Sequence, residues 1–168
     1  KLACQTMAEE GMVVVVPSHS EMVVAQSGTS QENPWGLDAS ENAASCSVAI
    51  DVGTTTVVCR LHDLATGQVI GTAGASNPQI AFGADVLSRI TACADGALVP
   101  MEEGISAELV AMIRELASAA SITCADIERV VLAGNTVMET IAAGIDPTPL
   151  GVSPFTPPTL FGADVNLP

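Results

Sequence analysis

Aromatic and basic residues are scarce in this chain of 168 residues. Phe, Trp and Tyr together make up 2% of it, with one Trp and no Tyr, so any core must be built from small and aliphatic side chains. Five basic residues stand against 19 acidic ones, which gives a formal net charge of -14 at pH 7. A surface this acidic repels nucleic-acid phosphates and anionic lipids. We therefore expect neither nucleic acid nor a membrane surface as a partner.

Long apolar runs and paired cysteines are also missing. The first apolar run, residues 12–16, is too short to cross a bilayer or to form the core of a secretory signal, so we expect a cytoplasmic location. The five cysteines are scattered and form no C-x-x-C pair, which argues against a zinc site or a dithiol centre. Most of them are expected to be small buried apolar residues. The chain begins without Met and stops in mid-pattern at Pro168, as expected of a fragment.

Composition divides the chain into three zones. Residues 1–17 hold a short apolar strand that Pro17 closes. Residues 18–45 are rich in Ser, Gln, Glu, Asn and Gly and are typical of a linker. Residues 46–168 alternate between the strand and helix periods, and this pattern predicts an α/β domain.

The α/β zone begins with a strand meander. Strands are predicted over 48–51, 56–62 and 68–75, and tight turns make them antiparallel neighbours. Helical spacing then covers 82–90, and a second helix carries an apolar stripe over 105–116. A buried strand over 130–133 is followed by a helix that ends near Gly144. We expect that helix to begin at Thr136 with a capping box to Glu139, and the prolines after residue 146 to keep the backbone extended.

The turn after the first strand has phosphate-binding chemistry. Gly53 lets the backbone come close to a ligand, and the amides and hydroxyls of Thr54, Thr55 and Thr56 can cradle phosphate oxygens. Asp51 at the strand end can hold Mg²⁺ through water. An ordinary hairpin turn uses the same residue types, so the residues alone leave both interpretations open.

Several other polar residues allow two interpretations each. Free amides at 134–136 (Gly134, Asn135, Thr136) suit a phosphate or a simple helix cap. Asp85 and Arg89, at i and i+4, indicate a surface ion pair, although Asp85 can also face a magnesium ion or a cleft. Asn77 and Gln79 can line the same cleft, but their chemistry assigns them no role. His19 and His62 have no partner at metal-ligand spacing.

Taken together, the motifs resemble a known family. Residues 50–56 (IDVGTTT) and the hairpin after them resemble the first phosphate motif of the actin, sugar-kinase and heat-shock-chaperone ATPases. NPQI at 77–80, GADVLSRI at 83–90, GNTVM at 134–138, PTPL at 147–150 and PF at 154–155 resemble, in order, the reductive activators of corrinoid proteins. This resemblance implies a ribonuclease-H-like first lobe of an actin-like ATPase over 46–168, incomplete here. It also implies ATP and Mg²⁺ bound between two lobes.

Cys4 acquires a role only through this resemblance. On its own it is best interpreted as a buried structural cysteine. Residues 1–17 are similar to the last strand of a plant-type two-iron two-sulfur ferredoxin domain, in which the fourth ligand comes late in the sequence. The resemblance thus implies that Cys4 is a cluster ligand of the intact protein, with the other three ligands absent from this chain.

The function implied by the family is ATP-dependent reduction of a corrinoid protein, with electrons passing from the iron–sulfur cluster to cob(II)alamin. Its partners would be the corrinoid protein and an electron donor, and a homodimer is a further possibility. Asp51 would hold Mg²⁺, whereas Gly53 to Thr56 and Gly134 to Thr136 would hold the nucleotide. The chain alone would not hydrolyse ATP. Alternatives are a fragment of a sugar-type kinase, for which only Asp85 offers itself as the base, and a non-catalytic partner-docking module.

Overall fold

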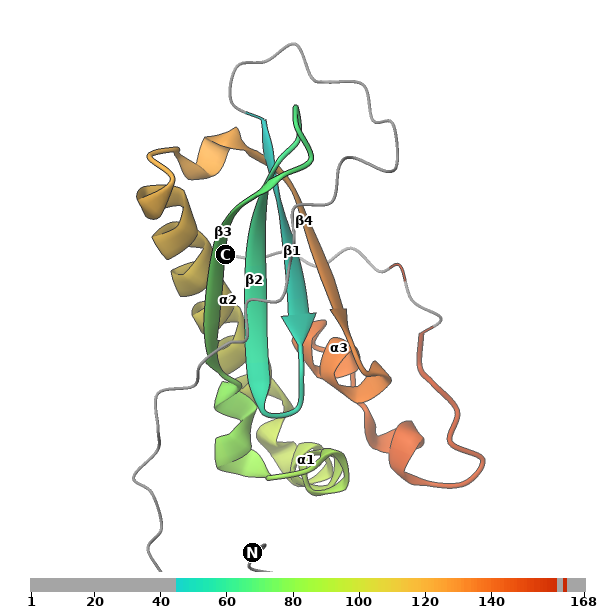
Figure 1. Ribbon diagram of the computed structural model, residues 1–168. Helices are drawn as coiled ribbons and strands as arrows, with labels where there is room; N and C mark the ends of the chain where they lie inside the picture. Colours follow the sequence, from blue (N-terminus) through green and yellow to red (C-terminus); the bar gives the residue numbers. More distant parts are fainter. Residues whose placement is uncertain (1–44, 160–161, 163–168) are drawn as a thin grey trace, which may run out of the picture.

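The computed structural model describes residues 45–159 and 162. The predictions for Cys4, His19, the strand at 12–16 and the linker at 18–44 lie outside these residues. The main elements are a four-stranded sheet in the order β3-β2-β1-β4 and three helices (Figure 1). They are β1 (Cys46–Val52), β2 (Thr56–Asp63), β3 (Val69–Ser76), α1 (Val86–Ala92), α2 (Leu98–Ala119), β4 (Ile127–Gly134) and α3 (Thr136–Ala142).

The predicted antiparallel meander of β1, β2 and β3 is confirmed. The Asp63 carboxylate forms the turn between β2 and β3 by accepting hydrogen bonds from the Ala65 and Thr66 amides at 2.7 and 3.3 Å. This is the local bonding for which Asp is favoured in turns. After α1 and α2, β4 pairs parallel to β1, so both strands finish at the same end of the sheet.

One face of the sheet forms the core together with α2. Buried and more exposed residues alternate along β1 and β2, as expected when one face of a sheet is covered. The covering helix presents the predicted apolar stripe, and it packs on β2 and β3. The core side chains that β1, β2 and α2 contribute include Val48, Ile50, Val52, Val57, Cys59, Leu61, Met101, Ile105, Leu109, Met112 and Leu116.

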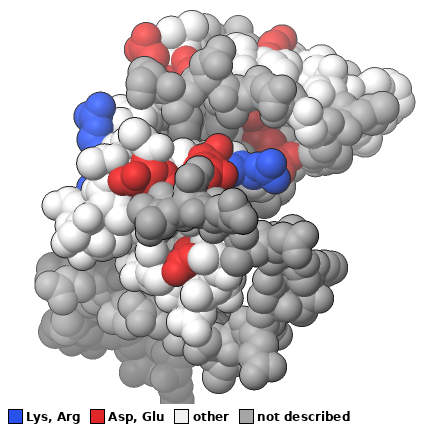
Figure 2. Space-filling model, turned by 90° about the horizontal axis from the view of Figure 1, so that it is seen from above, with Lys and Arg blue, Asp and Glu red and all other residues white. Residues whose placement is uncertain are grey.

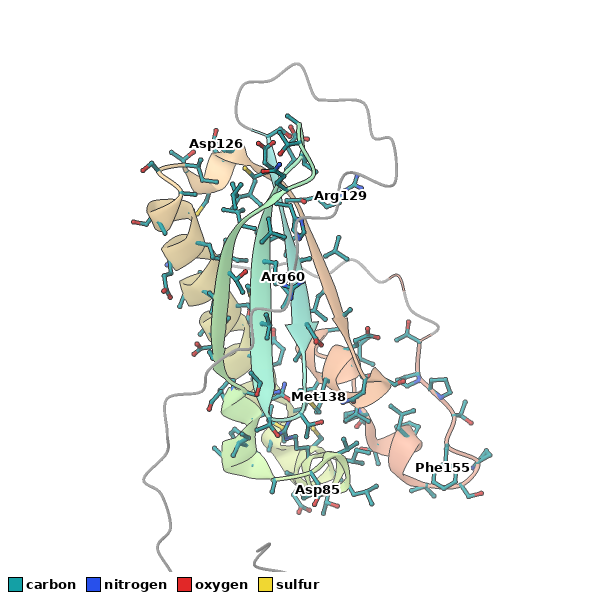
Figure 3. All side chains as sticks on the ribbon, in the orientation of Figure 1. Arg60, Asp85, Asp126, Arg129, Met138 and Phe155 are labelled. Carbon is teal, nitrogen blue, oxygen red and sulfur yellow. The ribbon has the colours of Figure 1, made fainter. Side chains whose placement is uncertain are left out.

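The opposite face is more open within the described part of the chain. In the cross-strand rows Ala49 and Asp51 are exposed, and Val131 of β4 is 54% exposed. The prediction that β4 is buried is therefore wrong, because β4 is the last strand of this sheet and none of the described elements covers its outer face. Arg60 lies midway along the sheet and Arg129 near its upper end (Figure 3). Seen from that end, acidic side chains stand out with few basic ones beside them (Figure 2).

The helix predicted over 82–90 is divided into two shorter elements. A 3₁₀ turn spans Pro78–Phe82, and α1 starts after Gly83 and a capping box formed by Asp85 and Ser88. Leu87, one of the apolar residues that give this segment its helical spacing, is 66% exposed. A kink at Gly96, with φ of 97°, then joins α1 to α2 through a turn of π-helix. None of the described helices has the length and apolar character needed to cross a membrane.

Candidate phosphate-binding site

The loop of residues 53–56 connects β1 to β2 at the end of the sheet where β1 and β4 both finish (Figure 1). Its first residue closes the hairpin, with the Gly53 N–H donating to the Thr56 carbonyl at 2.9 Å. A Cβ atom at position 53 would lie 2.7 Å from the same carbonyl oxygen. Glycine is therefore required here by the close approach of two backbone groups within the hairpin, and the predicted approach to a ligand stays a prediction.

All three carbonyl groups at 53, 54 and 55 are hydrogen-bonded from behind the loop. Asn77 supplies two of the donors: its Nδ2 reaches the Gly53 oxygen at 2.7 Å and its backbone N–H reaches the Thr55 oxygen at 2.8 Å. Arg89 Nη2 donates to the Thr54 oxygen at 2.5 Å. These contacts fix the orientation of each peptide plane, because a peptide whose carbonyl is held cannot rotate freely.

The amides of Thr54 and Thr55 are left available on the other side. Neither N–H group has an acceptor among the described residues, and Thr55 is exposed whereas Thr54 is half-buried. Successive unpaired amides of this kind form a concave site for anions such as phosphate. Buried side chains hold the carbonyls of Gly53 and Thr54, and a backbone N–H holds that of Thr55, so the loop is supported from the protein interior.

The second predicted segment, 134–136, meets this loop. Asn135 Nδ2 donates to Thr54 Oγ1 at 3.3 Å, and Gly134 approaches the Val52 oxygen so closely that a Cβ atom would lie 2.8 Å from it. The structure therefore brings Gly53, Thr54 and Asn135 together from β1 and β4. This proximity follows from the parallel pairing of the two strands.

The predicted helix cap is displaced by one residue. Asn135, not Thr136, is the N-cap of α3, because its Oδ1 accepts from the Val137 and Met138 amides at 3.1 Å each. Glu139 does reach back as predicted, but it accepts from the Gly134 N–H at 3.0 Å. The Gly134 amide is therefore engaged within the chain and does not face outward.

Asp51 lies on β1 with its side chain exposed, on the face of the sheet that α2 does not cover. The described residues contain no group of three or more His, Cys, Asp or Glu side chains that could hold a metal ion. A single carboxylate beside a loop with unpaired amides nevertheless suits Mg²⁺, which keeps several waters and takes phosphate oxygens as ligands.

A buried polar cluster behind the loop is the part of the site that the sequence does not reveal. Asn77, Gln79 and Arg89 are each fully buried. Arg89 donates to the Gly83 oxygen at 3.0 Å, to Gln79 Oε1 at 3.3 Å and to Met138 Sδ at 2.9 Å, besides Thr54. Met138 lies at this end of the sheet (Figure 3). Asparagine followed by proline at 77–78 is a helix-start signal, but it does not indicate the contact with Gly53.

The predicted surface ion pair of Asp85 and Arg89 is wrong, since the guanidinium points into the protein. Asp85 instead caps α1, where its Oδ1 accepts from the Ser88 amide at 2.9 Å. Hydrogen bonds from the Ser88 amide and hydroxyl lower the pKa of Asp85, and the Arg89 charge makes a smaller contribution in the same direction. Burial lowers the pKa of Arg89, and the Asp85 charge partly opposes this.

The fold and the loop together define a mixed α/β domain in which the first hairpin leaves the Thr54 and Thr55 amides without an acceptor among the described residues. The chain belongs to the family described as the RACo middle region, whose model matches residues 46–166. It is 37% identical over 110 residues to the corrinoid activation enzyme RamQ of Eubacterium limosum, covering 64% of this chain and 18% of RamQ.

A solved structure supports the same relationship. It is that of a reductive activator for corrinoid, iron-sulfur protein, and it is similar with a TM-score of 0.70 and 36% sequence identity. The match covers 73% of this chain and 20% of that one. The chain thus spans about a fifth of the length of these two relatives.

Proposed function

We propose that this chain is the first lobe of an ATP-binding module that drives the reductive activation of a corrinoid protein. The observation that carries the proposal is the loop at 53–56, with its carbonyls held from behind and its Thr54 and Thr55 amides free. The names of the two relatives supply the corrinoid partner. The lobe would have the ribonuclease-H-like fold that the sequence motifs imply.

In this proposal the chain's own residues perform the binding. The amides of Thr54 and Thr55 hold phosphate oxygens, and the hydroxyl groups of the loop threonines add further donors. Asp51 holds Mg²⁺ through its water shell, and the ion neutralises phosphate charge when it is bound. Asn135 fixes the Thr54 side chain from β4. Gly134 and Thr136 serve mainly to place Asn135.

The electron transfer requires parts that lie outside the described residues. Cys4 is proposed as one of four thiolate ligands of a two-iron two-sulfur cluster. One electron would pass from the reduced cluster to cob(II)alamin, which leaves the cluster oxidised and the cobalt as cob(I)alamin. ATP would be needed because that reduction is uphill. A separate electron donor re-reduces the cluster. The 18–45 segment would connect the two modules, in a protein of the cytoplasm.

The sugar-kinase alternative is less well supported. That reaction needs a general base, and Asp85 is the only candidate that the sequence offers. Its carboxylate is engaged as the N-cap of α1, and its lowered pKa makes it a weaker base than an ordinary carboxylate.

The nucleotide part of the proposal is tested by a chemical-shift titration of the ¹⁵N-labelled chain with Mg·ATP. The Thr54, Thr55 and Asn135 amide signals should move together and saturate, whereas signals from the upper end of the sheet should not. Mg²⁺ with AMP, which lacks the outer phosphates, is the matched control ligand. Shifts spread evenly over the chain, or equal for AMP, would reject phosphate binding at this loop.

The redox part needs a polypeptide extended at both ends to the length of the relatives. Mixed with a corrinoid protein and a chemical reductant, it should convert cob(II)alamin to cob(I)alamin, followed by its visible absorption, only when Mg·ATP is present. ATP-independent reduction at the same rate would contradict the proposal.

A further inference from the structure

Arg89 is the one charged side chain that is fully buried among the described residues. Its hydrogen-bond acceptors are two carbonyl oxygens, an amide oxygen and a thioether sulfur, all of them neutral. A buried cation without a bonded anion is costly, because the carbonyl dipoles replace only part of its lost hydration. Its position therefore calls for an explanation beyond packing.

The neighbouring glutamine shows how strongly the cluster is arranged around this charge. Gln79 Oε1 must face Arg89 Nη1 to accept its hydrogen bond. In that orientation the buried Gln79 Nε2 has no hydrogen-bond partner within the described part of the chain. An unpaired buried donor costs free energy. Gln79 is therefore oriented to accept from Arg89 at the cost of leaving its own amide nitrogen unpaired.

The Arg89 charge acts on the loop through one peptide group. Arg89 Nη2 donates to the Thr54 oxygen, which belongs to the same peptide as the Thr55 N–H. A donor on a carbonyl polarises its peptide and makes the N–H of that peptide a stronger donor, and a charged donor does so more than a neutral one. Asn77 acts in the same way, without a charge, on the peptide that carries the Thr54 N–H.

We propose that Arg89 is a positioning residue for phosphate binding. It orients the Thr54–Thr55 peptide and makes the Thr55 N–H a stronger hydrogen-bond donor to the anion, without touching the anion itself. This inference rests on the proposed nucleotide site and adds to it the origin of its positive potential. A phosphate at the loop would also offset part of the buried charge through the peptide group between them.

The ligand-free chain provides the first test. In Arg89→Met, which keeps most of the side-chain length, the Thr55 amide proton should shift upfield, whereas that of Thr54, polarised by Asn77, should change much less. Arg89→Lys should restore part of the shift, because it retains a charge. Equal changes at Thr54 and Thr55 would indicate a merely structural role and would overturn the proposal.

The second test is the Mg·ATP titration of the same variants. Arg89→Met should raise the half-saturating concentration by about tenfold, because the Thr55 N–H becomes a weaker donor to the phosphate, with a smaller rise in Arg89→Lys. Arg114→Met removes the same charge from an exposed position on α2 and should leave binding unchanged. An equal effect of Arg114→Met would reduce Arg89 to a contributor of net charge and would overturn its positioning role.

Failure of each idea has its own signature. If the wild-type chain shows no Mg·ATP shifts at the loop, the proposed nucleotide site fails and the inference fails with it. If the wild type binds and Arg89→Met binds equally well, only the inference fails. Should Arg89→Met not fold, the wild type still decides: a scalar coupling across the Arg89 Nη2 to Thr54 carbonyl hydrogen bond should strengthen with Mg·ATP, and an unchanged coupling would overturn the proposal.

Discussion

Gly53 has no room for a side chain, because its amide closes the hairpin onto the Thr56 carbonyl. A Cβ atom there would be 2.7 Å from a backbone oxygen that cannot move independently. We therefore expect Gly53→Ala to lower the free energy of unfolding by about 1–3 kcal/mol and to abolish the Mg·ATP shifts of Thr54 and Thr55. Urea denaturation and the titration described above measure the two effects.

Gly104 is the matched control for this substitution. It lies within α2, and a Cβ atom there would be 3.9 Å from the Pro78 side chain, an ordinary contact. Gly104→Ala should raise the free energy of unfolding by up to about 1 kcal/mol, since alanine is the better helix former, and should leave the Mg·ATP shifts unchanged. If both variants lost stability equally, close approach at Gly53 would not be the cause.

The cysteines differ in reactivity for reasons that are local to each residue. Burial, with a smaller contribution from Glu108, raises the pKa of Cys59 to about 12, so at pH 8 only about one part in ten thousand is thiolate, the reactive form. Cys46 and Cys93 are also buried, whereas Cys124 is exposed. Iodoacetamide at pH 8 should label Cys124 in the native chain, and peptide mass spectrometry should find Cys59 labelled only after denaturation. Native labelling of Cys59 at the rate of Cys124 would contradict this burial.

At the scale of the elements, the junction of β4 and α3 has two roles that one pair of substitutions can separate. Asn135 caps α3 through its oxygen and holds Thr54 through its nitrogen. Asn135→Ala should cost about 1 kcal/mol of stability together with nucleotide binding. Asn135→Asp keeps the capping oxygen, so stability should be nearly retained, but the loop loses a donor and gains a negative charge. We expect its Mg·ATP affinity to fall as far as that of Asn135→Ala or further. Thermal unfolding and titration of both variants provide the measurements, and unchanged binding in Asn135→Asp would remove Asn135 from the site.

The elements that could be predicted from the sequence are those whose signals are local. Alternation and turn residues identify β1 to β3, and the apolar stripe identifies α2. Gly53 and the threonines at 54–56 can be recognised because the residue types that form a turn are adjacent in the sequence. The exposure of β4 could not be predicted in this way, because an apolar strand is covered only if another element reaches it.

Arg89 shows the same limit within the site. Its spacing from Asp85 indicates a surface ion pair, but spacing along one helix cannot reveal acceptors that come from elsewhere. The acceptors that hold it, Thr54 and Met138, are 35 and 49 residues away in the sequence. Only the folded arrangement of β1, α1 and α3 shows that the guanidinium belongs to the loop.

For the whole molecule, the open face of the sheet and the outer edge of β4 should determine how the chain associates. β4 pairs only with β1 among the described strands, and Val131 is 54% exposed. Such an edge is a template for pairing with a second chain. Sedimentation velocity should show self-association that grows with concentration and that Val131→Lys reduces. Val99→Lys, at a residue of α2 that is 59% exposed, should not reduce it. An equal effect of the two variants would point to net charge instead of the strand.

The site is one-sided, which limits what the chain can do alone. The amides of Thr54 and Thr55 and the carboxylate of Asp51 all come from the end of one sheet, where Asp51 and Thr55 are exposed. Hydrolysis requires phosphate and attacking water to be positioned and shielded from bulk solvent. We therefore expect the chain to bind Mg·ATP but to release phosphate no faster than a buffer blank, measured by a coupled phosphate assay. The polypeptide extended to the length of the relatives should turn over, and Gly53→Ala in that polypeptide should not. A rate on the order of 1 s⁻¹ from the chain alone, typical of ordinary enzymes, would show that this lobe carries a complete catalytic site.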